Sequence, residues 1–553
     1  MKNRVQSRLA VILLVLVLML TGCGSGPGHN GAAQEALTLA DGGVSEFRII
    51  CAAGSTQQTM DLAGTLQKEI LRLTGATVEI YEDLALNASG ETGEILLGSS
   101  DRSEDNAVFS SLVCIGDYRV QVEGRKLVIA AAKDESLLAA VQELCLVLGD
   151  YLHDGKLILP ADFVLSGSTD EGENVSIPAF TDGTLRAGVD GGNGTQLLVY
   201  AAASAACDTY LNTLAEAGYD LYGENEIDGN RYFTCVGNGA TVTVMDNPAL
   251  GTVRISVDPV EYRLPTMSQK IDAVVQPSVT LLGLEGYLTS GAPTQTGLSL
   301  LYQLCDGSFI VVDGGHNKIE ASSQIYTAMR QLAPDPDHIT IAAWLITHSH
   351  NDHAGAFLSF RRNYGHQVAV EKILVNFPGD GQYESASTGT SYKTNVLAEA
   401  AKLPGAEVIK VHPGQILHLR DAEIEILYTL DLYAPQTLTD FNDSSVVCTV
   451  TLGGQRMLVT GDCGVMTSGI LCKLYDEALR CDIVQMSHHG YAGATEELYR
   501  EVDPLYVLWP SGSTTYERYQ TAGNNVWLIN ESRMKQLWLA EDKVQTLLLP
   551  VEE

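Results

Sequence analysis

Residues 346–355 read ITHSHNDHAG, a stretch with four side chains of metal-binding type. These are His348, His350, Asp352 and His353. The residues before them, 338–347, form an apolar, β-branched run of strand length, and residues 354–364 read as the first turns of a helix. The pattern therefore places the cluster on a strand-to-helix turn at the C-terminal end of a strand, where α/β folds hold their chemistry.

The spacing of these ligands favours two adjacent cations over one. Side chains two positions apart in an extended segment point to the same side, so His348 and His350 face a common point. The chain then turns and brings Asp352 and His353 to a second point nearby. We therefore expect a site for two divalent metal ions.

The H-x-H-x-D-H pattern after an apolar strand resembles the signature of the metallo-β-lactamase-fold hydrolases, and the resemblance covers residues 278–553. It implies an enzyme, a metallo-hydrolase, with an α/β fold whose C-terminal part is an αββα sandwich. Two small accessory units of α/β (α+β) type precede the sandwich, because strand and helix patterns also alternate in residues 46–166 and 184–264.

Later strand ends supply further residues that match the family by resemblance. Asp313 matches an aspartate that orients the metal-binding loop without binding metal. Asp462 matches the carboxylate that bridges two cations. His488 matches the last metal ligand, and His489 is placed behind it or near the substrate, although these two roles can be exchanged. The resemblance thus gives Asp352, His489 and Asp313 catalytic or supporting roles.

One ligand of the family pattern is missing from this chain. Many members carry another histidine between the cluster and the bridging aspartate, but residues 440–447 contain none. Asn442, Asp443 or Ser444 occupies the place of that histidine. Of these, Asp443 is the candidate replacement ligand, and a water molecule is the alternative. The other histidines of this region precede the strand 422–428 and are expected on loops: His366, His412 and His418.

The departure itself points to one branch of the superfamily. The combination of N-D-x-S, G-D and H-H-G resembles the branch that contains the extracytoplasmic hydrolase domain of DNA-uptake competence proteins (ComEC-like) and the phosphorylcholine esterases. The run YVLWP at residues 506–510 and the closing strand 544–550 continue that likeness. The branch implies substrates of phosphodiester type.

The expected ligands are imidazole and carboxylate, with no thiolate, which suits Zn²⁺ or Mn²⁺. Two such ions roughly 3.5–4 Å apart can share a water molecule and lower its pKa towards about 7, so that it attacks as hydroxide. Cys463 directly follows Asp462, and we expect it to be a packed thiol rather than a ligand.

The N-terminus has the pattern of an export signal. Lys2, Arg4 and Arg8 precede an apolar run at residues 9–20, and the following L-T-G-C resembles the lipobox of bacterial lipoproteins. By that resemblance Cys23 is lipidated, and the protein is anchored at the outer face of the cytoplasmic membrane. An uncleaved membrane-spanning anchor is the alternative, but the apolar run is short for a span.

Composition and polar, glycine-bearing stretches define the domain boundaries. The 553 residues are too many for one core. We expect the following order: signal 1–22, tether 23–45, accessory unit 46–166, linker 167–183, second unit 184–264, linker 265–277 and hydrolase domain 278–553.

The formal charge of −34 narrows the choice of substrate. Such a surface repels nucleic acid at long range, so a small or glycan-linked phosphodiester is the favoured substrate. One alternative is a lactamase or lactonase, which the missing histidine disfavours. The other is a surface-binding lipoprotein that keeps the fold without catalysis. No motif implies a partner protein.

Overall fold

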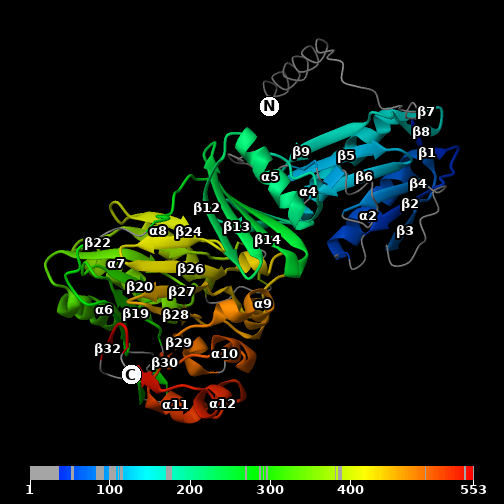
Figure 1. The fold of residues 1–553 in the computed structure, drawn as a ribbon. Coiled ribbons are helices and arrows are strands. Elements are labelled where there is room, and N and C mark those ends of the chain that lie inside the picture. The colour runs from blue at the N-terminus through cyan, green and yellow to red at the C-terminus, as the bar shows by residue number, and fades with distance from the viewer. Residues whose placement is uncertain are drawn as a thin grey trace.

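The computed structural model describes residues 36–51, 55, 57–82, 93–98, 108–109, 111–112, 116–131, 133–169, 177–267, 271–284, 288–289, 292–293, 297–379, 382–383, 389–491, 493–540 and 544–551. The signal 1–22, Cys23 and most of the tether lie outside these residues. Among the described residues, no helix is both long and apolar enough to cross a membrane. The first unit, the second unit and the C-terminal domain follow one another in space as in sequence (Figure 1).

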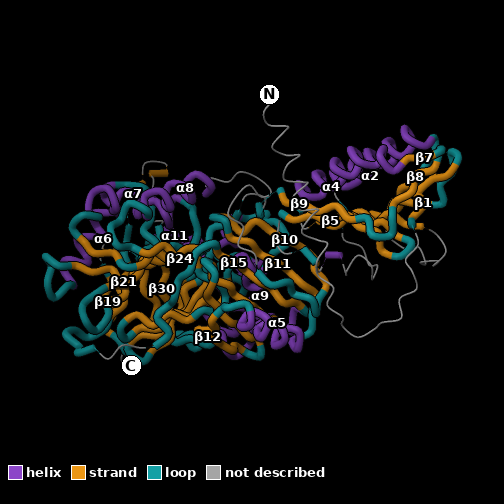
Figure 2. The backbone as a smooth tube through the Cα atoms, turned by 90° about the horizontal axis from the view of Figure 1, so that it is seen from above, coloured by secondary structure: helices purple, strands orange, loops and turns teal. Residues whose placement is uncertain are grey.

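The first unit is built on a mixed sheet of order β3-β2-β4-β6-β5-β9, with a small sheet β1-β8-β7 beside it. Helices α2 and α4 cover one face of the mixed sheet (Figure 2). Its elements are β1 (Leu37–Asp41), β2 (Phe47–Cys51), α2 (Gln57–Thr74), β3 (Glu79–Glu82), β4 (Gly93–Leu97), β5 (Asp117–Glu123), β6 (Lys126–Ala131), α4 (Asp134–Val147), η1 (Leu148–Tyr151), β7 (Leu152–His153), β8 (Lys156–Leu159) and β9 (Val164–Ser168).

The second unit is an antiparallel sheet of order β10-β11-β15-β14-β13-β12 with one helix. Successive side chains of β11 point to opposite faces of the sheet. Leu198 therefore packs with α5, while Leu197 and Val199 pack against the C-terminal domain. The elements are β10 (Thr184–Gly192), β11 (Thr195–Ala201), α5 (Ser204–Glu216), β12 (Asp220–Ile227), β13 (Asn230–Gly237), β14 (Ala240–Asn247), η2 (Pro248–Leu250) and β15 (Thr252–Asp258).

The C-terminal domain contains two large sheets. The first has the order β24-β23-β21-β20-β19-β16-β32, with β22 paired to β21, and a small β17-β18 pair lies apart from it. Its elements are β16 (Ser278–Leu281), β17 (Leu288–Thr289), β18 (Ala292–Pro293), β19 (Leu300–Gln303), β20 (Phe309–Val312), α6 (Ile319–Leu332), β21 (Ile339–Leu345), α7 (Asn351–Tyr364), β22 (Val368–Val370), β23 (Lys372–Val375), α8 (Gly389–Ala400), β24 (Glu407–Lys410) and β32 (Gln545–Leu548).

The second sheet has the order β25-β26-β27-β28-β29-β30-β31. Its elements are β25 (Ile416–Leu419), β26 (Ala422–Tyr428), η3 (Leu430–Leu432), η4 (Phe441–Ser444), β27 (Val447–Leu452), β28 (Gln455–Val459), α9 (Val465–Tyr475), η5 (Asp476–Leu479), β29 (Ile483–Gln485), η6 (Ser487–Gly490), α10 (Glu496–Val502), β30 (Tyr506–Trp509), α11 (Ser513–Tyr519), α12 (Gly523–Asn530) and β31 (Gln536–Leu539).

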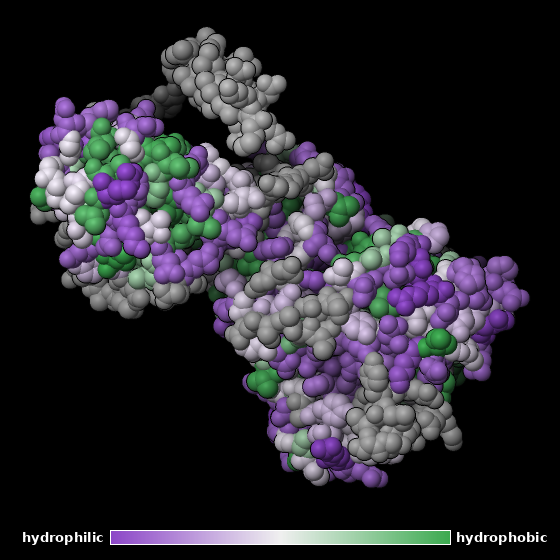
Figure 3. All heavy atoms as spheres, turned by 180° about the vertical axis from the view of Figure 1, so that it is seen from behind, coloured by the Kyte–Doolittle hydropathy of each residue, from purple (hydrophilic) through white to green (hydrophobic). Residues whose placement is uncertain are grey.

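The two sheets pack face to face and each carries helices on its outer face, which confirms the expected αββα sandwich. Alternate residues of β20 show the layering, because Ile310 and Val312 enter the core between the sheets while Phe309 and Val311 pack under α6 and α7. Helices α9, α10 and α12 cover the second sheet. Figure 3 shows that the coloured part of this domain is mainly hydrophilic on the face seen from behind.

A buried cluster of charged residues, formed by His412, Asp258 and Asp431, connects the second unit to the C-terminal domain. His412, which follows β24, contacts Asp431 Oδ2 through Nδ1 at 2.5 Å and Asp258 Oδ2 of β15 through Nε2 at 2.9 Å. Burial opposes the charged imidazole, but the two carboxylates raise the pKa of His412 to about 9. Lys410 lies in the same cluster and donates to the Gly191 carbonyl. His412 was expected on a loop, and it does lie between strands, but its side chain is fully buried.

We expect His412→Gln to destabilise the protein most at mildly acidic and neutral pH. Its pKa is raised on folding, so its stabilisation is complete below the unfolded value of about 6.5 and disappears as pH rises through about 9. Removing one member of a buried ion pair costs about 3 kcal/mol or more. Urea unfolding between pH 6 and 10 should show a difference from wild type that shrinks with rising pH. The exposed His366→Gln serves as control, and a pH-independent difference would contradict this account.

Candidate metal centre

Asp313 ties together the loop that follows β20 and the loop that follows β21. Its Oδ1 accepts the Thr347 backbone N–H at 2.8 Å, and its Oδ2 accepts the Thr347 hydroxyl at 2.7 Å. The same Oδ2 lies 2.8 Å from His353 Nδ1. These bonds leave His353 Nε2 facing the centre of the site. Asp313 therefore orients a ligand and lies outside the ligand group itself.

Asp352 and His353 lie in the first turn of α7, which begins at Asn351 rather than after the cluster as the sequence indicated. His350 is the N-cap residue of this helix, with extended backbone angles. Gly355 makes the close approach of the helix to the 313–317 loop possible. A Cβ at that position would lie 2.3 Å from the Asn317 nitrogen.

Asp462 is presented by a tight turn after β28. Gly461 has a φ of +54°, and a Cβ there would lie 2.9 Å from Ser445 Oγ. The side chain of Gln485 holds this turn, because its Oε1 accepts the N–H groups of Thr460 and Gly461 at 2.8 Å. The Asp462 N–H donates to Ser445 Oγ at 3.1 Å.

The H-H-G turn exchanges the roles expected for its two histidines. His488 and His489 both have positive φ, of 49° and 53°, which is strained backbone for non-glycine residues. His489 turns inward and is 1% exposed, whereas the side chain of His488 is 35% exposed and lies 4.0 Å from Asp462 Oδ2. Of the two assignments that the sequence left open, the geometry favours His489 as the ligand, because the turn directs His489 into the group of potential metal ligands.

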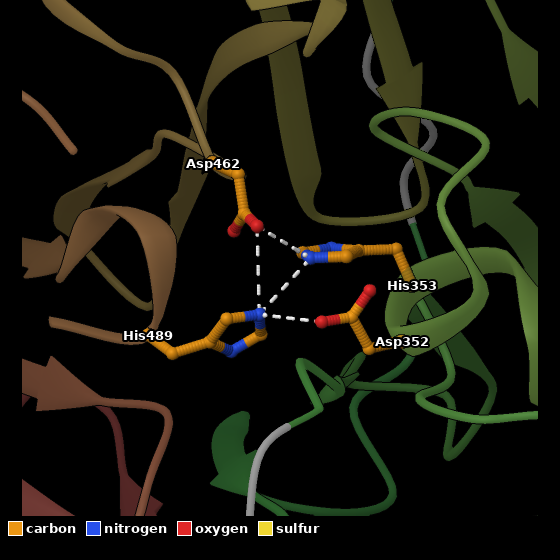
Figure 4. Close-up of side chains that lie close together, drawn as sticks. All are labelled: Asp352, His353, Asp462 and His489. Atoms are coloured by element: carbon orange, nitrogen blue, oxygen red, sulfur yellow. Dashed lines mark hydrogen bonds and ion pairs between the residues drawn. The ribbon is translucent and has the colours of Figure 1, made fainter. Parts of the chain in front are cut away.

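Four groups from both sheets meet at one point: Asp352, His353, Asp462 and His489. Their ligand atoms all lie within 4.8 Å of one another (Figure 4). His489 Nε2 is 3.2 Å from Asp352 Oδ2 and 3.5 Å from Asp462 Oδ2. His353 Nε2 is 3.0 Å from Asp462 Oδ2. This geometry suits one divalent cation with imidazole and carboxylate ligands.

His348 and His350 form a second point beside this cluster. His348 Nε2 lies 3.0 Å from His350 Nδ1, and the His348 ring centre lies 4.2 Å from that of His353. Asp462 interacts electrostatically with both histidines. The two points expected from the sequence thus lie side by side, because the rings of His348 and His353 are in contact.

Asp443 does not reach the metal centre, which corrects the expectation that it replaces the missing ligand. Its Oδ1 accepts the backbone N–H of Gly464 at 2.7 Å and of Thr467 at 3.2 Å. These groups open helix α9, so Asp443 caps this helix, where a carboxylate also complements the helix dipole. Asn442, which precedes Asp443, interacts with His350 instead.

Opposite charges at the centre shift the protonation of its groups. Burial opposes ionisation, yet His353 and His489 hold the pKa of Asp462 well below its ordinary value. Burial also opposes the charged form of His489, but Asp462 and Asp352 raise its pKa to about 9. Protons on His353 and His489 therefore balance the carboxylates, and a cation that binds must displace them.

The residues fit a divalent metal. Asp462 Oδ1 is buried and has no hydrogen-bond partner among the described residues, which is costly for a carboxylate unless a cation binds there. The donor set consists of imidazole nitrogens and carboxylate oxygens. Cys463 is a buried free thiol whose Sγ contacts the Ser487 hydroxyl, and burial raises its pKa, so it is not a thiolate ligand.

Sequence reasoning missed side chains that surround the centre. His316 is 6% exposed and interacts with Asp352. The Phe441 ring lies 5.3 Å from that of His350, and Tyr491 lies 6.0 Å from His489. For His316 a signal existed, because it follows Asp313-Gly-Gly directly. For the aromatic residues no local pattern pointed to the site.

Comparison with known proteins agrees with this fold. Residues 296–508 match the family model described as metallo-beta-lactamase superfamily, so this part of the chain is a domain of that superfamily. No curated protein matches the chain. Fold and metal-ligand group together define a metalloenzyme domain.

Among solved structures, the metallo-beta-lactamase fold protein YhfI from Bacillus subtilis is 13% identical over 49% of this chain and 100% of its own, with a TM-score of 0.30. CmlA, a diiron beta-hydroxylase from Streptomyces venezuelae, is 14% identical over 50% of this chain and 54% of its own, with a TM-score of 0.31. The short form of human tRNase Z is 13% identical over 50% of this chain and 100% of its own, with a TM-score of 0.26.

We expect His489→Ala to lose metal, because its imidazole lies within the ligand group. His488→Ala should retain the wild-type metal content, because its ring lies outside that group. Asp443→Ala should also retain metal, but should lower the free energy of unfolding by about 1 kcal/mol through loss of a helix cap. Elemental analysis and urea unfolding of the three variants check this. Metal loss in His488→Ala with retention in His489→Ala would restore the original assignment.

Proposed function

We propose that the protein is a metal-dependent hydrolase of phosphodiester-type substrates that acts outside the cytoplasm while tethered to the membrane. The observation that carries the proposal is the position of Asp462. Its carboxylate belongs to one group with Asp352, His353 and His489, and it interacts electrostatically with the neighbouring pair of His348 and His350. One oxygen contacts His353 and the other is buried without a hydrogen-bond partner among the described residues.

Two divalent cations, Zn²⁺ or Mn²⁺, fit these residues. Asp352, His353, Asp462 and His489 would hold one of them, and His348 and His350 with Asp462 would hold the other. Bound cations would supply the Lewis acidity and the lowered water pKa that hydrolysis at neutral pH requires. Asp313 fixes the tautomer of His353, because its carboxylate accepts a hydrogen bond from Nδ1 and leaves Nε2 free to bind a cation.

The substrate class rests on the residues around the centre. The position of the missing histidine is flanked by Asn442, in keeping with the branch of the superfamily that cleaves phosphodiesters. His488 lies half-exposed beside Asp462 and takes the substrate-facing role first given to His489. The formal charge of −34 disfavours long nucleic acids, so we favour a small or glycan-linked phosphodiester.

Two other functions would use the same fold. A lactamase or lactonase would also need a metal centre, but the ligand that lactam-cleaving members use is absent. A surface-binding lipoprotein would need no metal, and it is disfavoured by the buried Asp462 Oδ1, which has no hydrogen-bond partner in the described part of the chain.

Metal-loaded protein should hydrolyse bis-p-nitrophenyl phosphate, and chelation should abolish the activity. Asp462→Asn should lower kcat at least about 100-fold, because the electrostatic contribution of a bridging group is lost. Release of p-nitrophenol measures the rate, with His366→Gln as the exposed control. Inactivity of the wild type with Zn²⁺ and Mn²⁺ on this diester, combined with turnover of nitrocefin, would favour the lactamase alternative.

The proposed tether depends on Cys23. In bacterial cells the full chain should fractionate with membranes and enter the detergent phase on Triton X-114 partitioning. Cys23→Ala should remain unlipidated and keep its uncleaved signal, which mass spectrometry of the purified protein detects. A wild-type chain whose N-terminus carries no lipid would contradict the lipoprotein assignment.

A further inference from the structure

His316 stands beside the ligand group without belonging to it. It follows Asp313-Gly314-Gly315 and is 6% exposed. Its imidazole interacts electrostatically with Asp352, His489 and His353, so it borders the same centre. The four-membered ligand group excludes it.

The loop that carries His316 is fixed to helix α7. The Gly314 N–H donates to the His353 carbonyl at 2.7 Å, and the Ala356 N–H donates to the Gly315 carbonyl at 2.8 Å. Gly355 permits this contact, since a Cβ there would lie 2.8 Å from the His316 carbonyl carbon. The position of His316 is therefore coupled to the first turn of α7, which holds Asp352 and His353.

Asn351 fixes the tautomer of His316. The Asn351 Oδ1 accepts the backbone N–H of Asn317 at 3.0 Å, which assigns the other end of the amide as the donor. That donor, Nδ2, lies 3.2 Å from His316 Nδ1. His316 Nδ1 is therefore an acceptor, and the proton of the neutral ring is on Nε2. Burial lowers the pKa of His316, which keeps the ring neutral at pH 7.

A neutral imidazole in this tautomer can donate a hydrogen bond but cannot bind a metal. Nδ1 is occupied by Asn351, and Nε2 carries a proton. A neutral donor next to a cation site stabilises an anionic oxygen without repelling the cations, as a charged lysine or arginine would. Such preorganised donors are typical of sites in which negative charge develops on a substrate oxygen.

We propose that His316 is a substrate-binding residue that donates its Nε2–H to an anionic oxygen of the substrate phosphate. Asn351 is its positioning residue. This inference deepens the proposed hydrolase function and rests on it for the identity of the substrate group, while the tautomer rests only on the geometry of Asn351.

The first test is the affinity for inorganic phosphate of the metal-loaded full-length protein, measured by calorimetry. His316→Phe keeps a ring but removes the donor, and we expect the Kd to rise about tenfold or more. His316→Gln keeps an N–H donor and should stay within about threefold of wild type. Equal phosphate affinity in wild type and His316→Phe would overturn the proposal. Loss of metal from His316→Phe would also overturn it, because it would make His316 a ligand.

The second test reads the tautomer directly. Two-bond ¹H–¹⁵N spectra of protein labelled at histidine, assigned with His316→Gln, should show the Nε2–H form of His316. The Nδ1–H form would overturn the proposal. His338→Phe, on the exposed side chain of His338, is the matched control and should change neither phosphate affinity nor metal content.

Turnover separates this inference from the proposed function. On bis-p-nitrophenyl phosphate, His316→Phe should lower kcat about 100-fold with metal content unchanged, and His316→Gln should recover most of the rate. A wild type that binds phosphate through His316 but does not turn over the diester would refute the hydrolase function and leave the binding role supported. Full turnover by His316→Phe would refute the binding role alone.

Discussion

The contacts of His353 with two buried aspartates join the two halves of the C-terminal domain. Its Nδ1 lies 2.8 Å from Asp313, at the end of a strand in the first sheet, and its Nε2 lies 3.0 Å from Asp462, at the end of a strand in the second. All three side chains are buried, so neither carboxylate can exchange its imidazole partner for water. The two sheets must therefore pack so that the strand ends that carry Asp313 and Asp462 both lie within hydrogen-bond distance of His353.

The backbone is strained at several of the turns that surround the centre. Asp313, His488 and His489 all have positive φ, and each lies just after a strand that feeds the centre. Residues in this region of backbone space are unfavourable unless the surroundings fix them. Ser511 supports the turn of His488 and His489, because its hydroxyl donates to the His489 carbonyl, and Gln485 supports the neighbouring turn that presents Asp462. The strained turns at the site therefore lie beside side chains that hydrogen-bond to the backbone there.

The second unit shares a core with the catalytic domain. Met245 and Tyr232 pack in the same cluster as Tyr475 and Leu427, and the hydroxyls of Tyr232 and Tyr475 lie 2.5 Å apart. The His412 cluster adds buried charge to this interface. Apolar burial of this kind makes the second unit a structural part of the domain, whereas the first unit lies at the far end of the molecule (Figure 1).

The sequence by itself determined the fold class and most of the centre. Period-two apolar runs place strands, and H-x-H-x-D-H must follow a strand end, so His348, His350, Asp352 and His353 could be found locally. It did not decide between His488 and His489, because both follow the same strand and only the backbone angles of the turn select the inward ring. Nor did it show that Asp443 caps α9, or that His316 borders the metal ligands. Those facts depend on contacts between residues distant in the chain, which only the tertiary structure brings together.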